Sequence, residues 1–202
     1  MDKKILVVNG HPDPRPERYG YALCDAYGAG VQSSGLETRR LNVGELHFPF
    51  DTAIHPTAQP LGDLARAVEA IHWATQLAIV FPLWLDAPPP ILCKLFEASA
   101  RTKGMPCAAH IVVTMSMPAF MHRSKFRADG HTPNSICAIS LAGVAARQTT
   151  FIGSVEKISA EQRRQWLETI AAYGALAAKR PDSGAYGRWR ANDLLPDART
   201  AA

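Results

Sequence analysis

Three side chains able to bind an anion lie close together after a short apolar stretch. His11, Arg15 and Arg18 follow Gly10, where the apolar run of residues 4–9 ends. If a helix begins just beyond them, its unpaired backbone N–H groups and its dipole attract an anion, and arginine side chains suit phosphate. The segment has neither the GxGxxG nor the P-loop pattern. It predicts a phosphate site, and the alternative is a proline-rich turn with exposed arginines.

Two further stretches have the side chains that a planar ring requires. The first is a wall of proline, aliphatic and aromatic side chains formed by Pro82, Leu83, Trp84 and Leu85. The second supplies small polar and flexible thioether side chains from Thr114, Met115, Ser116 and Met117. A flat ring could pack on the first wall, with backbone N–H groups at its polar edge. Trp84 could equally be a core residue.

These segments are positioned by an alternation of strands and helices. Short β-branched or apolar runs predict strands at residues 4–9, 38–43, 77–83, 111–114 and 149–155. Apolar residues at helical spacing predict helices at residues 17–34, 61–71, 91–101 and from 160 to about 177. The last helix follows a capping box formed by Ser159 and Gln162. The run at 77–83 is the most apolar and is placed centrally, whereas 38–43 is placed near an edge.

Strands that alternate with helices predict an α/β fold with a doubly wound, five-stranded parallel sheet. The rhythm fits the flavodoxin-like strand order 2-1-3-4-5. In that order a crevice opens beyond the carboxyl ends of the first and third strands. The loops after strands one, three and four therefore meet there. A phosphate site next to a wall for a planar ring indicates a flavin site.

Composition excludes several other classes of protein. The 202 residues are 47% hydrophobic and 20% charged, with a net charge of +4, and this balance is typical of a folded domain. The basic residues are scattered, which argues against a nucleic-acid partner. No apolar run is long enough for a membrane span, and the four cysteines form no CxxC pair, so we expect reduced thiols, no metal site and a cytoplasmic location. Residues 1–180 are predicted to form one domain and 181–202 a tail.

Four stretches, in order, resemble a known family. They are VVNGHPDP at residues 7–14, VFPLWL at 80–85, VTMSMPAF at 113–120 and FIGSVE at 151–156. The chain resembles the flavodoxin-like NAD(P)H:quinone oxidoreductases, the DT-diaphorase-related group that includes bacterial modulator-of-drug-activity proteins. The resemblance covers most of residues 3–178.

The resemblance implies a flavin, usually FAD with FMN as the alternative, and NAD(P)H as cosubstrate. It places the flavin phosphates at His11, Arg18, Tyr19 and Gly20. Arg15, in the same loop, is also predicted to bind the cofactor. It places the isoalloxazine ring at Pro82 to Leu85 and its pyrimidine side at Thr114 to Met117. It also implies a homodimer and hydride transfer in two steps, from nicotinamide to the flavin and then to a quinone.

The chain departs from the family pattern near the expected substrate pocket. Asp86 replaces a usual glycine, and it either disfavours the anionic reduced flavin or points to solvent. A Phe-rich segment of the pocket wall is missing, so the pocket is expected to be shorter or more open. Where relatives carry Tyr and His, this chain aligns His122 and Asp129, the predicted catalytic residues, with His131 nearby. The alternative for His122 is a surface loop position.

Two functions follow as hypotheses. The first is a cytoplasmic flavin-dependent NAD(P)H oxidoreductase that reduces quinones or similar two-electron acceptors. The alternative is a weakly catalytic or non-catalytic flavin-binding protein with a regulatory or ancillary role. The choice between NADH and NADPH stays open, because Arg123, Lys125 or Arg127 could each meet a 2′-phosphate.

Overall fold

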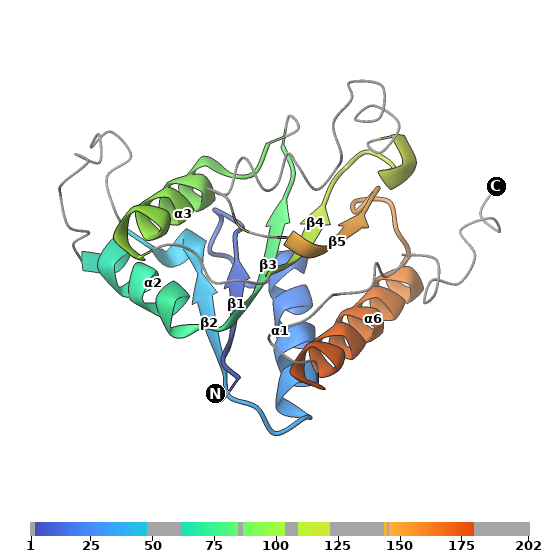
Figure 1. Ribbon diagram of the computed structural model, residues 1–202. Coiled ribbons are helices and arrows are strands. Elements are labelled where there is room, and N and C mark those ends of the chain that lie inside the picture. The colour runs from blue at the N-terminus through green and yellow to red at the C-terminus, as the bar shows by residue number, and fades with distance from the viewer. Residues whose placement is uncertain are drawn as a thin grey trace.

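Five parallel strands form the central layer of the protein, in the order β2-β1-β3-β4-β5 (Figure 1). They are β1 (Ile5–Asn9), β2 (Thr38–Asn42), β3 (Gln76–Pro82), β4 (Ala109–Thr114) and β5 (Ala146–Ile152). This computed structural model describes residues 3–47, 62–84, 87–103, 109–121, 144 and 146–179. The predicted α/β class, the parallel sheet and the strand order are confirmed.

Helices cover both faces of the sheet. On one face lie α2 (Gly62–Trp73) and α3 (Pro90–Lys103), and on the other lie α1 (Tyr19–Gln32) and α6 (Ala160–Lys179), as Figure 1 shows. A short 3-10 helix, η1 (Val43–Glu45), follows β2. None of the helices in the described part of the chain combines the length and the hydrophobicity required of a transmembrane helix.

The alternation of side chains along each strand explains the two helical layers. In β1, Leu6 and Val8 belong to the core beneath α2 and α3, while Ile5 and Val7 belong to the core beneath α1 and α6. Successive residues of a strand point to opposite faces, so a strand that is apolar throughout must be covered on both sides. The strand β3 is buried in the same way and occupies the centre of the sheet, as predicted.

Element boundaries differ from the predictions where the backbone turns. The helix α1 begins at Tyr19, two residues later than predicted, because Arg18 has an extended backbone with a ψ of 133°. The strand β5 ends at Ile152, three residues earlier than predicted, because the chain turns at Ser154, whose φ is 52°. The capping box before α6 is present. The Ser159 N–H donates to Gln162 Oε1 at 2.8 Å, and the Gln162 N–H donates to Ser159 Oγ at 3.1 Å.

Because the strands are parallel, the loops that follow β1, β3, β4 and β5 gather at one edge of the sheet.

Several predicted residues lie outside the described residues, and so does the predicted tail at 181–202. They are Leu85, Asp86, His122, Arg123, Lys125, Arg127, Asp129 and His131.

Candidate functional site

A cleft of about 400 Å³ opens at the carboxyl edge of the sheet, and we call it the carboxyl-edge cleft. The loop after β1 and the start of α1 line it with His11, Asp13, Glu17, Arg18, Tyr19 and Gly20. The loops after β3, β4 and β5 and the start of α6 add Pro82, Leu83, Trp84, Thr114, Met115, Ser116, Val155, Glu156 and Arg163. Most of the residues predicted to bind the flavin are therefore brought together. Arg15 and Met117 are described but do not line the cleft.

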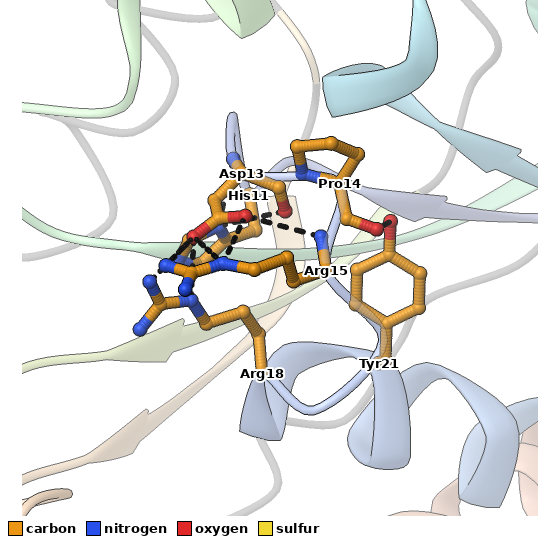
Figure 2. Close-up of polar contacts among 6 residues, drawn as sticks. All are labelled: His11, Asp13, Pro14, Arg15, Arg18 and Tyr21. Atoms are coloured by element: carbon orange, nitrogen blue, oxygen red, sulfur yellow. Dashed lines mark hydrogen bonds and ion pairs between the residues drawn. The ribbon is translucent and has the colours of Figure 1, made fainter.

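The first loop, residues 10–18, is held rigidly against the sheet. The Gly10 N–H donates to the carbonyl of Val80 at 2.7 Å, which extends the pairing of β1 with β3. The Tyr21 hydroxyl donates to the carbonyl of Pro14 at 2.9 Å (Figure 2). Gly44 of η1 lies so close that a Cβ there would sit 2.8 Å from the carbonyl oxygen of Pro12. Contacts on both sides thus fix the path of the loop.

The two arginines of the first loop both bind Asp13. Figure 2 shows both guanidinium groups turned toward the Asp13 carboxylate. Arg15 donates from Nε and Nη2 at 2.9 and 2.6 Å, and Arg18 donates from Nε at 2.7 Å, all to Oδ2. These bonds, with those from Arg15 first, hold the pKa of Asp13 well below its ordinary range. The sequence predicts an anion site at these arginines but does not reveal this internal anion.

The His11 ring is held against the backbone of Asp13. Its Nδ1 accepts a hydrogen bond from the Asp13 N–H at 3.0 Å. The same Nδ1 lies 3.3 Å from the carbonyl oxygen of Asp13, so the ring contacts both backbone polar groups of that residue. Burial is the main cause that lowers the pKa of His11, and the charges of Arg18 and Arg15 lower it further. The predicted contribution of His11 to an anion site is therefore a hydrogen bond rather than a charge at neutral pH.

The lowered pKa of His11 predicts a loss of stability on acidification. Between that pKa and the ordinary value of 6.5 the unfolded chain binds more protons than the folded one, so the free energy of unfolding falls as the pH drops through this range. We expect wild type to lose more stability than His11→Gln between about pH 7.5 and pH 5.5. Urea unfolding of both proteins measures this, and equal losses would contradict it. Asp13 does not interfere, because it titrates below this range.

Trp84 forms an exposed wall of the cleft. Its side chain is 50% exposed, so the alternative interpretation as a core residue is wrong. The Trp84 N–H donates to the carbonyl of Ala87 at 3.1 Å and the Ala87 N–H returns a bond of 2.9 Å, so the two backbones are paired. The Leu83 N–H donates to the carbonyl of Thr114 at 2.8 Å and ties this wall to the next loop. The His11 and Trp84 rings meet edge to face, with centroids 5.8 Å apart.

The opposite wall joins the loops after β4 and β5. The Met115 N–H donates to the carbonyl of Ile152 at 3.0 Å, and the Val155 N–H donates to the carbonyl of Met115 at 3.1 Å. The Ser116 hydroxyl donates to Glu156 Oε1 at 3.0 Å. These bonds fix the predicted polar side of the site, and they also bring a carboxylate to its rim.

Arg163 is a cleft residue that the sequence analysis missed. Its Nη2 donates to the carbonyl of Val155 at 2.7 Å, and its guanidinium lies over the Tyr19 ring at 5.0 Å from the centroid. The Tyr19 hydroxyl donates in return to the carbonyl of Arg163 at 3.0 Å. The available signal was the capping box, which places Arg163 in the first turn of a helix that starts beside the strand edge. Val155 and Glu156 also line the cleft and were not among the predicted site residues.

The cleft has a mixed charge. Three carboxylates, Asp13, Glu17 and Glu156, face it together with the two guanidinium groups of Arg18 and Arg163. In the described part of the chain, His, Cys, Asp and Glu side chains form no group of three or more that could hold a metal ion. The apolar wall at Trp84 and the two arginines suit a planar ring that carries an anionic group. Carboxylates line the same cleft, so the anionic group would meet both signs of charge.

Fold and cleft together define a doubly wound α/β protein with a cleft at the point where the strand order reverses. The chain belongs to a family with a flavodoxin-like fold, whose model matches residues 3–176. No curated protein matches the chain.

Solved structures share the fold at low identity. An NAD(P)H:quinone oxidoreductase from Methanothermobacter marburgensis is similar with a TM-score of 0.71 and 14% identity, over 90% of this chain and 100% of that one. An FMN-dependent NADH-azoreductase from Bacillus anthracis, in complex with FMN, has a TM-score of 0.64 and 10% identity, with coverages of 88% and 100%. An azoreductase from the same species has a TM-score of 0.60 and 14% identity, with coverages of 87% and 98%.

Proposed function

We propose that the protein is a flavin-dependent NAD(P)H oxidoreductase that transfers two electrons to a quinone or a similar acceptor. The observation that carries this proposal is the carboxyl-edge cleft, where the exposed Trp84 wall faces the same space as the first loop. Similar structures are named as quinone and azo-compound reductases that use NAD(P)H or NADH, which supports the same chemistry. The acceptor belongs to the class of quinones, and azo compounds are the second class to test.

The described residues fit the two ends of a flavin. Trp84, Leu83 and Pro82 offer an apolar face for the ring, and the backbone and side chains of Thr114 to Ser116 offer polar groups to its edge. The N-terminus of α1 offers backbone N–H groups to a phosphate, and Arg18 offers a guanidinium. A bound flavin would accept a hydride from nicotinamide and pass it on, while these residues orient it and exclude water.

We propose FMN as the preferred flavin, and FAD, the form implied by the family resemblance, as the alternative. One similar structure is described in complex with FMN. The volume of the cleft lies within the usual range for a small-molecule site. His122 and Asp129 remain the proposed catalytic residues, and both lie outside the described residues.

We also propose a homodimer. Several large apolar side chains near the carboxyl edge are exposed, as expected of a surface that a second copy covers. They are Trp84, Met117, Phe120 and Met121. Sedimentation of the flavin-loaded protein tests the proposal, and a monomer at micromolar concentration would contradict it.

The experiment that tests the function begins with the visible spectrum of the protein titrated with FMN and with FAD. Under anaerobic conditions, NADH or NADPH should bleach the flavin absorbance, and a simple benzoquinone should restore it. A flavin that binds but is bleached by neither nucleotide would favour a regulatory flavin-binding protein. A protein that binds neither flavin would refute both functions.

A further inference from the structure

The first loop already contains an anion at the position where its donors converge. The Asp13 carboxylate accepts bonds from the Arg15 backbone N–H at 3.1 Å and from the Arg15 side chain. It also accepts two bonds from the Arg18 guanidinium. One main-chain N–H and two guanidinium groups around a single anion resemble the donor set that proteins offer to a phosphate.

The loop cannot easily move this carboxylate aside. Pro12 and Pro14 flank Asp13, the Tyr21 hydroxyl holds the carbonyl of Pro14, and Gly44 packs against the carbonyl of Pro12. The Asp13 side chain is 22% exposed, whereas that of Arg18 is 43% exposed. The arginine therefore has more freedom to exchange partners than the carboxylate has to leave.

Arg15 and Arg18 offset the negative charge of Asp13, but the donors that they direct at it are already engaged when a phosphate arrives. Glu17 lines the same part of the cleft, and Arg15, which shares Asp13, does not line it. Burial lowers the pKa of His11, so its ring adds no full positive charge at neutral pH. A phosphate that binds Nε or Nη2 of Arg18 must displace Asp13 from these atoms, and it then lies next to two carboxylates.

We infer that Asp13 occupies the phosphate position of the site and lowers the selectivity of the protein for phosphorylated over unphosphorylated flavin. This inference rests on the proposed flavin-binding function. The phosphate of FMN gains the bonds of Arg18 but competes for them with Asp13, so it adds less affinity than a free arginine would provide. Riboflavin has the same ring and no phosphate, and its binding does not depend on that exchange.

The test compares Asp13→Asn with wild type for binding of FMN and of riboflavin. Asparagine keeps the shape of the side chain and removes its charge. We expect the affinity for FMN to rise about tenfold, while the affinity for riboflavin stays within about twofold. Quenching of flavin fluorescence on binding measures both constants. The matched control is Asp25→Asn, which neutralises an aspartate of α1 that pairs with Arg40 and does not line the cleft.

A second variant separates competition for Arg18 from a general change in charge. In an Arg18→Gln background, Asp13→Asn should raise the affinity for FMN much less than it does in wild type. An equal gain in both backgrounds would show simple charge repulsion and would overturn the inference. Thermal unfolding confirms that each variant is folded before its binding constants are compared.

The remaining outcomes are also decisive. If Asp13→Asn leaves the ratio of FMN to riboflavin affinity unchanged, Asp13 does not compete with phosphate. If the variant weakens FMN binding, Asp13 instead holds Arg18 in place for the phosphate, and the inference is wrong. If wild type binds neither ligand, the proposed function itself fails, a result that differs from an unchanged ratio.

Discussion

Replacing Gly30 with alanine is expected to lower the free energy of unfolding by about 3 kcal/mol or more, because two helices touch at this residue. A Cβ at Gly30 would lie 1.9 Å from the carbonyl oxygen of Ala171, which belongs to the backbone of α6. The contact is mutual, since a Cβ at Gly174 would lie 2.2 Å from the carbonyl oxygen of Tyr27 in α1. Backbone atoms cannot rotate away as a side chain can, so the helices must separate. Urea unfolding measures the loss.

Gly28→Ala is the matched control, because it makes the same change two residues earlier in α1. A Cβ at Gly28 would meet nothing within 4 Å. Alanine has the higher helix propensity, so this variant should be more stable by about 0.5–1 kcal/mol. If Gly30→Ala and Gly28→Ala change stability equally, the helices do not approach as closely as the structure shows.

Gly153→Ala is expected to weaken flavin binding by about tenfold or more, because it displaces one wall of the cleft. The protein is expected to stay folded. A Cβ at Gly153 would lie 2.3 Å from the backbone nitrogen of Ala119 and 2.9 Å from the carbonyl oxygen of Met117. The Ser154 N–H donates to that same carbonyl at 3.0 Å. The added methyl group must push apart the loops after β4 and β5, and Met115 and Ser116 then move out of the cleft.

Binding of FMN to Gly153→Ala, followed by fluorescence quenching, measures this effect. Circular dichroism verifies that the fold is retained. The control is Ser154→Gly in the same turn. Ser154 has a φ of 52°, a backbone conformation that glycine adopts without strain, so the substitution should preserve the turn and the affinity. A Gly153→Ala protein that binds FMN like wild type would show that this turn does not shape the site.

The fold was largely predictable because its signals are local and repeat along the chain. An uninterrupted apolar run such as β3 must be buried on both faces, and the alternation with helices then requires parallel strands. The capping box of Ser159 and Gln162 was predictable for the same reason, since both partners lie within one helical turn.

The position of the cleft was predictable from strand order, but its chemistry was not. The sequence shows His11, Arg15 and Arg18 in one loop, yet it does not show that the arginines turn toward Asp13. That choice depends on side-chain rotamers and on a loop path set by Tyr21. The anion site therefore stays a prediction, and the structure adds the carboxylate of Asp13 to its predicted donors.

The class of fold, the order of the strands and the edge at which the cleft opens followed from the sequence, because hydrophobic periodicity decides which faces are buried. Only the tertiary structure decided which side chains meet. Arg163 reaches Tyr19 from 144 residues away, and the backbones of α1 and α6 touch at Gly30. Such contacts arise from packing between elements distant along the chain, and no local pattern of residues specifies them.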